Sequence, residues 1–399
     1  MKVFVKRLAS CIQRNEKIQQ YRDFLLSQGH EIVKNPNESD IIIIWTCAFR
    51  TDARDNSLQY IQQMENEYQN KVIAIGCLPD IDPVNLHLSY SGKSIGWREE
   101  QKLFSLFSSK SNNDPIDRPV YIEPPVCDDI EAYKRNNKSA DLHFYDQFIK
   151  LVICEGCPYK CSYCTERLTF PKFKSFPINE IIQSSSDMIK KTSCRTFAFL
   201  GDCTGEYGND IGSSIIQLIN NICSLDDKIN IALSNFNIKN YMDYFDDFNS
   251  LIGRRKIFHI NLPIQSGSDR VLQQMERPYC VSDIIAVFNS FKDMDFNSFD
   301  THIIVGFPGE TDEDFNKTIE LLLLFKPKYV LISAYLETLK VTSYNYGNKV
   351  NQEVINERIR KAVSIFSENN IICNYEGSDL INSRFARLKS DDRWSCEKK

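Results

Sequence analysis

The chain has 399 residues, of which 42% are hydrophobic and 25% are charged, and this composition excludes a disordered or collagen-like protein. With 48 basic and 53 acidic side chains the net charge is −5, so the overall charge gives no attraction to nucleic acid. The longest apolar runs, residues 41–45 and 321–325, are far shorter than the roughly 20 residues of a membrane-spanning helix, and the first residues contain no secretory signal. We therefore expect a soluble cytoplasmic protein.

Residues 1–100 alternate strand-like and helix-like segments, which predicts a small parallel α/β domain. One apolar run ends just before Cys47 and another just before Cys77. Helical patterns follow Cys11 at residues 13–27 and Cys47 at residues 54–67. Cys11 also comes just after a predicted strand. Because the carboxyl ends of parallel strands face the same side of a sheet, these three cysteines can converge on one point. We expect a three-thiolate site there, and unrelated core or surface thiols are the alternative.

Residues 101–145 are rich in Lys, Asn, Asp, Ser and Pro, which indicates a linker and surface excursion. Residues 146–340 then repeat a strand–helix rhythm that predicts a partial TIM barrel of the (β/α)6 type. The six predicted strands are residues 148–154, 196–200, 229–234, 258–264, 299–305 and 329–334. A capping sequence at Thr311 predicts a helix over 312–325. Residues 341–399 are expected to form a C-terminal helix, ending near Asn370, and a short tail.

The barrel type places function at the carboxyl ends of its strands, where the polar and glycine-rich loops fall. One of these loops, directly after the first barrel strand, contains Cys157, Cys161 and Cys164 in the spacing C-x3-C-x2-C. Thiolates are the preferred ligands of iron–sulfur clusters, which usually take four. Three ligands would leave one iron open to a small molecule.

Two other interpretations of this loop remain open. Cys154 and Cys157 could pair with Cys161 and Cys164 around zinc, although the three residues between the pairs are far fewer than usual zinc sites have. The cysteines could also be unliganded, but Gly156 and its neighbours indicate a loop instead of an apolar face. Cys154 ends an apolar run, and we interpret it as a buried strand residue instead of a ligand.

The cysteine loop resembles the signature of the radical SAM superfamily, with Tyr163 at its aromatic position. The chain resembles more specifically the methylthiotransferases that modify tRNA adenosines or a ribosomal-protein aspartate. The similarity covers roughly residues 1–340. It rests on Cys11 and on the segments TCAFR, IGCLP, EGCPYKCSYC, LGDCTGEYG, LPIQSGSDRVLQQMERPY and IIVGFPGETDEDF.

The resemblance implies two [4Fe–4S] clusters and S-adenosyl-L-methionine (SAM). Cys157, Cys161 and Cys164 would hold the cluster that binds and reductively cleaves SAM, and Cys11, Cys47 and Cys77 would hold an auxiliary cluster that carries the sulfur. No catalytic residue is implied beyond these ligands. By similarity, the residues in contact with SAM would be Tyr163, Gly201, Asp202, Ser234, Gln265 and Val305. Flavodoxin or ferredoxin would supply electrons.

Several features depart from the family pattern and bear on the substrate. Too few residues follow the last predicted helix for the family's C-terminal TRAM domain, and position 202 is Asp where the tRNA enzymes usually have Gln. Together with the acidic net charge, these features favour a methylthiotransferase acting on a peptide or protein side chain, such as a natural-product precursor or a ribosomal protein.

A tRNA adenosine methylthiotransferase is the alternative. A second enzymatic alternative inserts sulfur without methylation. A non-catalytic iron–sulfur carrier or redox protein is the alternative of another class, and it would not need loops shaped for SAM.

Overall fold

The computed structural model describes residues 1–8, 12–49, 51–108, 122–124 and 144–376. The chain divides into two units. The N-terminal unit contains residues 1–118, 162–172 and 336–345, and the barrel unit contains residues 119–161, 173–335 and 346–399. Within the parts of the chain that the structure describes, no helix has the length and apolar character needed to cross a membrane.

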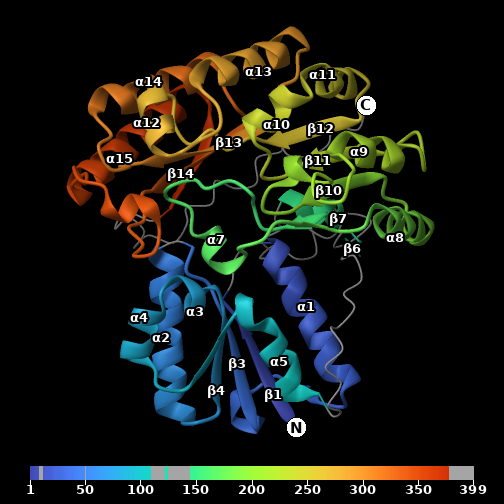
Figure 1. Cartoon of the computed structure of the whole chain (residues 1–399), viewed down its shortest axis with the longest axis vertical. Helices are drawn as coiled ribbons and strands as arrows, with labels where there is room; N and C mark the ends of the chain where they lie inside the picture. The colour runs from blue at the N-terminus through green and yellow to red at the C-terminus, as the bar shows by residue number, and fades with distance from the viewer. Residues whose placement is uncertain (9–11, 50, 109–121, 125–143, 377–399) are drawn as a thin grey trace. The chain divides into compact units, whose positions relative to one another are not determined.

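The N-terminal unit is built on a parallel five-stranded sheet with strand order β2-β1-β3-β4-β5 (Figure 1). Its strands are β1 (Lys2–Arg7), β2 (Glu31–Val33), β3 (Ile41–Thr46), β4 (Val72–Gly76) and β5 (Lys93–Gly96). Its helices are α1 (Ile12–Ser27), α2 (Thr51–Tyr68), α3 (Cys77–Ile81), α4 (Pro83–Ser89), α5 (Glu100–Phe107) and α7 (Glu166–Thr169), with 3-10 turns η1 (Pro36–Glu38), η2 (Trp97–Glu99) and η5 (Thr342–Asn345).

Burial explains the unbroken apolar runs of this sheet. Every residue of β4 and all but the first of β3 are buried, as expected for parallel strands that are covered on both faces. Tyr21 of α1 packs edge-on against Trp45 of β3 and Phe104 of α5, with ring centroids 5.5 Å apart in both pairs. The predicted small parallel α/β fold is therefore confirmed.

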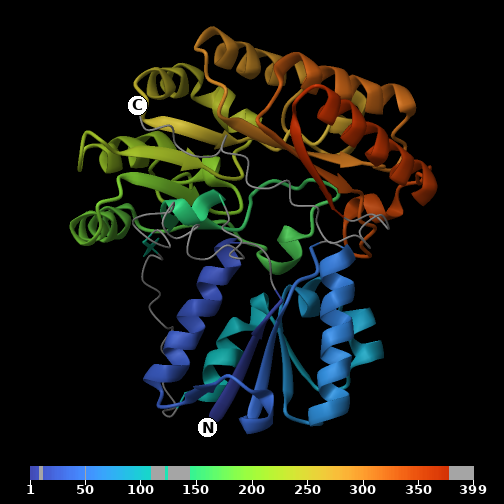
Figure 2. The same cartoon turned by 180° about the vertical axis from the view of Figure 1, so that it is seen from behind.

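The barrel unit contains an eight-stranded sheet in the order β15-β14-β13-β12-β11-β10-β7-β6 (Figures 1 and 2). All of its strands are parallel except β6 at the edge. The strands are β6 (Ile122–Glu123), β7 (Ile149–Val152), β10 (Thr196–Leu200), β11 (Asn230–Leu233), β12 (Ile257–Asn261), β13 (Phe299–Val305), β14 (Tyr329–Ala334) and β15 (Ile372–Glu376). A separate hairpin pairs β8 (Cys154–Glu155) with β9 (Lys174–Ser175).

Helices connect the parallel strands of this sheet, as the strand–helix rhythm predicts. They are α8 (Ile178–Lys191), α9 (Ile215–Cys223), α10 (Ile238–Asp243), α11 (Phe245–Gly253), α12 (Asp269–Gln274), α13 (Val281–Asp293), α14 (Asp312–Phe325) and α15 (Gln352–Glu368), with 3-10 turns η3 (Phe144–Gln147) and η4 (Thr204–Glu206).

The sheet departs from the prediction at its far edge. The sequence predicts six parallel strands, whereas β15 adds a seventh in a segment that was expected to be a tail. The sequence Ile372–Glu376 has no clear alternation, and β15 exists because it pairs with β14 from Tyr329↔Ile372 onward. The segment 101–145, expected to be a linker, also departs from the prediction. Its residues 101–107 are helical in α5, and most of the rest lies outside the described residues.

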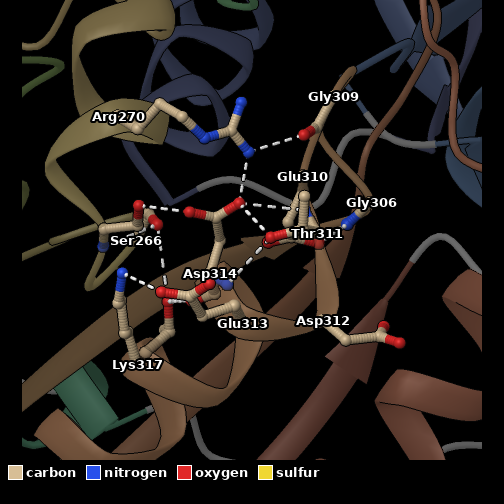
Figure 3. Close-up of polar contacts among 12 residues, drawn as sticks. Ser266, Arg270, Gly306, Gly309, Glu310, Thr311, Asp312, Glu313, Asp314 and Lys317 are labelled. Atoms are coloured by element: carbon tan, nitrogen blue, oxygen red, sulfur yellow. Dashed lines mark hydrogen bonds and ion pairs between the residues drawn. The ribbon is translucent and has the colours of Figure 1, made fainter.

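A polar network fixes the loops at the carboxyl ends of β12 and β13. Asp314, in the first turn of α14, accepts a hydrogen bond from the Thr311 backbone N–H at 2.9 Å and pairs with Arg270 (Figure 3). It also accepts a hydrogen bond from Ser268 Oγ at 2.6 Å. Arg270 in turn donates to the carbonyl oxygen of Gly309 at 2.6 Å. Thr311 and Asp314 form the predicted capping box. These contacts join the start of α14 to the loop before α12.

Candidate cluster and cofactor sites

The loop that contains Cys157 begins with a turn held by a carboxylate. Gly156 has a φ of 74°, in the left-handed region that favours glycine, and its N–H donates to Asp202 Oδ2 at 2.7 Å. Asp202 follows β10, and β10 pairs with β7, which leads into the cysteine loop. Cys154 is 1% exposed in β8, which confirms its predicted position as a buried strand residue.

Contacts around Cys157 favour its thiolate form. A hydrogen bond from the Cys203 thiol lowers the pKa of Cys157, and the nearby charge of Arg277 lowers it further, while burial opposes both. Arg277 Nη1 also donates to Cys161 Sγ at 3.3 Å, and Cys161 is buried. The structure thus places Cys157 and Cys161 beside one guanidinium group. Cys164 is half-buried and belongs to the N-terminal unit.

A second set of contacts holds the middle of the loop. The Tyr159 hydroxyl donates to the carboxylate of Glu206, which also accepts a hydrogen bond from Asn240 Nδ2 at 2.6 Å. Burial and this hydrogen bond to Glu206 raise the pKa of Tyr159 far above its ordinary value, so the phenol stays protonated. The loop is therefore tied to η4 and to α10 by neutral donors and one carboxylate.

Five of the residues expected to contact SAM lie at the carboxyl ends of four neighbouring strands. Gly201 and Asp202 follow β10, Ser234 follows β11, Gln265 comes four residues after β12, and Val305 is the last residue of β13. The sixth expected residue, Tyr163, belongs to the N-terminal unit. The barrel unit thus gathers five of the six predicted positions along one edge of its sheet.

Three of these positions also have clear structural roles. A Cβ on Gly201 would lie 2.5 Å from Cys154 Sγ, so only glycine fits without a shift. Ser234 Oγ donates to the carbonyl oxygen of Phe199 at 2.9 Å. Gln265 has a φ of 66°, and its backbone continues the pairing with β13, at Ile303. These contacts show how the edge of the sheet is shaped.

In the N-terminal unit, Cys47 and Cys77 lie at matching positions on adjacent strands. The register of β3 and β4 pairs Thr46 with Gly76, and each cysteine is the next residue in the chain. Both thiols are buried, and Trp97 Nε1 donates to Cys77 Sγ at 3.3 Å. The predicted convergence is therefore present for these two cysteines.

The third cysteine of the predicted auxiliary site, Cys11, lies outside the described residues. Among the residues that are described, no three His, Cys, Asp or Glu side chains lie close enough to hold a single metal ion.

Sequence comparisons match two family models to the chain in succession. The Radical SAM superfamily matches residues 151–322, and the family described as "Uncharacterized protein family UPF0004" matches residues 2–92. The "Probable threonylcarbamoyladenosine tRNA methylthiotransferase" of Methanocaldococcus jannaschii is 28% identical over 384 residues, which cover 93% of this chain and 86% of that protein. These matches support a radical SAM methylthiotransferase of the two-cluster type. Another relative, the "tRNA-2-methylthio-N(6)-dimethylallyladenosine synthase" of Fervidobacterium nodosum, is 28% identical over 79% of this chain and 71% of its own length.

A solved structure supports the fold of this methylthiotransferase. The radical S-adenosylmethionine methyltransferase TsrM from Kitasatospora setae, with cobalamin and a [4Fe–4S] cluster bound, superimposes with a TM-score of 0.58 at 10% sequence identity. The match covers 86% of this chain and 76% of TsrM. At this low identity the similarity establishes the α/β fold alone.

The methylthiotransferase uses SAM and two [4Fe–4S] clusters. The donors at both candidate sites fit such clusters, because thiolates are their usual ligands. Hydrogen bonds reach the sulfurs of Cys157, Cys161 and Cys77. Hydrogen bonds of this kind are a known feature of the shell around cluster ligands.

Sequence reasoning missed Arg277 in this methylthiotransferase. The residue lies within the segment 262–279 on which the family resemblance rests, but no pattern there indicates that it contacts a cysteine 116 positions earlier in the chain. Its position one residue after a left-handed residue, Glu276 with a φ of 55°, is visible only in the folded chain.

Proposed function

We propose that this methylthiotransferase inserts sulfur and a methyl group into an N6-modified adenosine of tRNA. The observation that carries the proposal is the similarity to the Methanocaldococcus jannaschii relative, whose name specifies a tRNA substrate, along 93% of the chain. The Fervidobacterium nodosum relative is also named for a tRNA adenosine. These names favour tRNA over the peptide or protein substrate that the acidic net charge and the departures from the family pattern led us to expect.

In this proposal six cysteines hold the two clusters. Cys157, Cys161 and Cys164 bind the cluster that works with SAM, and Cys11, Cys47 and Cys77 bind the auxiliary cluster. When bound, SAM and the clusters supply the electron transfer, the hydrogen abstraction, the sulfur and the methyl group. A low-potential carrier such as flavodoxin or ferredoxin delivers the electrons, and the reaction takes place in the cytoplasm.

The residues of the barrel unit position and shield the reaction. Asp202 fixes the turn before Cys157 by accepting the Gly156 N–H at 2.7 Å. The residues proposed to contact SAM are Tyr163, Gly201, Asp202, Ser234, Gln265 and Val305. Ser234 and Val305 are buried, so these positions contribute to a site from which water is excluded.

The test is an anaerobic reaction of the reconstituted, reduced enzyme with SAM and with tRNA from a strain that lacks methylthiotransferases. The digested nucleosides are separated and weighed by mass spectrometry. We expect a methylthio-adenosine with the wild type and none with Cys157→Ala or Cys77→Ala. Cys280→Ala, which changes an exposed cysteine outside both sites, is the matched control and should retain activity.

Two results would contradict the proposal. SAM cleavage without any modified nucleoside, together with methylthiolation of a peptide, would restore the peptide substrate. A complete lack of SAM cleavage would instead favour an iron–sulfur carrier.

Binding of tRNA should weaken steeply with added salt, because phosphate contacts release counterions.

A further inference from the structure

Arg277 is held in place by the way that α12 ends. Glu276 adopts a left-handed conformation, and the Arg277 N–H donates to the carbonyl oxygen of Leu272 at 2.9 Å. This pattern is the Schellman motif, which reverses the chain directly after a helix. The end of α12 therefore fixes the backbone of Arg277 independently of the contacts that its side chain makes.

The guanidinium group is oriented by contacts from three of its nitrogens. Nε donates to the Tyr279 hydroxyl at 2.8 Å, Nη2 donates to the carbonyl oxygen of Pro263 at 3.1 Å, and Nη1 donates to Cys161 Sγ at 3.3 Å. Tyr279 is itself buried, and its hydroxyl donates to the carbonyl oxygen of Ile264 at 3.0 Å. Nη2 is thus anchored directly to the β12–α12 loop, Nε is anchored to the same loop through Tyr279, and Nη1 points at a proposed cluster ligand.

A guanidinium in this position changes the electrostatics of any cluster bound by Cys161. The reduced cluster carries one more negative charge than the oxidised cluster, so a fixed positive charge and an N–H···S hydrogen bond stabilise the reduced form more. Net charge, hydrogen bonds to sulfur and solvent exposure are the factors by which proteins set iron–sulfur potentials. The effect is larger in a buried site such as that of Cys161, which is 6% exposed, because water screens it less.

We propose that Arg277 raises the reduction potential of the SAM-binding cluster, and so sets how readily that cluster accepts the electron needed to cleave SAM. Arg277 is a positioning and tuning residue that acts through Cys161. The inference rests on the proposed assignment of Cys157, Cys161 and Cys164 to that cluster.

The test measures the potential of this cluster alone, in the Cys11/Cys47/Cys77→Ala background. Titanium(III) citrate gives one electron to each [4Fe–4S]²⁺ cluster to form [4Fe–4S]⁺, and the signal of the reduced form is followed by electron paramagnetic resonance. In Arg277→Met, which keeps an unbranched apolar side chain but removes the guanidinium group and its charge, we expect the reduction equilibrium to fall about tenfold, a shift of about 59 mV to lower potential. Arg277→Lys keeps the charge but not the fork, and it should give an intermediate shift.

Arg254→Met is the matched control. It removes an exposed arginine of the same unit, whose Nε donates to the Ser250 carbonyl oxygen of its own helix. An unchanged potential in both Arg277 variants would overturn the inference. A shift as large in the Arg254 variant would overturn it too, because overall charge would then explain the result.

The iron content separates failure of this inference from failure of the proposed function. About four irons per chain in the background variant are expected, and their absence would refute the cysteine assignment. If Arg277→Met cannot hold a cluster, Arg277→Lys and Tyr279→Phe decide the question. Tyr279→Phe removes the acceptor of Nε and should lower the potential of the cluster, by a smaller amount than Arg277→Met. An unchanged potential in both Arg277→Lys and Tyr279→Phe would refute a role for Arg277.

Discussion

Replacement of Glu310 by glutamine should leave the protein at least as stable as the wild type above pH 7, although the change removes half of a buried ion pair. Glu310 is 5% exposed, and its Oε2 accepts the Gly306 N–H at 2.7 Å and Arg358 Nη1 at 2.9 Å. Burial raises the pKa of Glu310 from 4.5 to about 7, and these two donors oppose that shift without cancelling it. Burial of the charge is therefore the larger effect.

The raised pKa fixes the sign and the size of the expected change. The folded protein binds the Glu310 proton more tightly than the unfolded chain does, so this contribution to stability is complete below pH 4.5 and is lost as the pH rises to about 7. The difference amounts to about 3 kcal/mol, at about 1.4 kcal/mol for each pH unit. Glutamine keeps an acceptor oxygen for Gly306 and Arg358 without a charge, so this pH dependence should disappear.

The assay is urea unfolding of the reconstituted protein under anaerobic conditions, followed by circular dichroism at pH 5 and pH 8. We expect Glu310→Gln to equal or exceed the wild type at pH 8 and to lose less stability between the two pH values. Arg358→Met should cost about 3–5 kcal/mol at pH 8, because it leaves the Glu310 carboxylate buried without its partner, and much less at pH 5. A loss of more than about 1 kcal/mol in Glu310→Gln at pH 8 would refute this reasoning.

Two further predictions concern the loops around the cysteines. Asp202→Ala removes the acceptor of the Gly156 N–H and should lower the iron retained after reconstitution. Asp210→Ala, the matched control in the same unit, should not lower it. Equal iron in the wild type and in both variants would count against the turn as a determinant of cluster binding. Gly201→Ala should cost about 1–3 kcal/mol of unfolding free energy, because the new methyl group meets Cys154 Sγ. Adding Cys154→Ala should restore part of that loss in urea unfolding, and a double variant no more stable than the single one would show that the sulfur is not the obstacle.

Sequence patterns predict this fold well where local signals and burial agree. The predicted strands 196–200, 299–305 and 329–334 coincide with β10, β13 and β14, and the predicted helix 312–325 coincides with α14. The strand predicted at 258–264 ends instead at Asn261, two residues before Pro263, which has no N–H for a ladder. The seventh strand could not be predicted, because it depends on a partner 43 residues earlier instead of on its own pattern.

The candidate sites show the same difference between features that sequence patterns predict and features that depend on distant parts of the chain. Parallel topology alone predicts that Cys47 and Cys77 lie together, and the register of β3 and β4 bears this out. Gly201, Ser234 and Val305, which the family resemblance implies as SAM contacts, lie at or just after the carboxyl ends of their strands, where a barrel of this type places its function. Contacts between distant segments could not be predicted, because neither spacing nor periodicity encodes them, and the hydrogen bond from Arg277 to Cys161 is the clearest example.

The most direct test of the account is the iron and sulfide content of anaerobically reconstituted protein, with Mössbauer spectra, for the wild type and for Cys11/Cys47/Cys77→Ala. Two [4Fe–4S] clusters on the assigned cysteines predict about eight irons in the wild type and about four in the triple variant. About four irons in both proteins would eliminate an auxiliary cluster on these three cysteines, and the proposed methylthiolation of tRNA by this chain would lose its sulfur-carrying site.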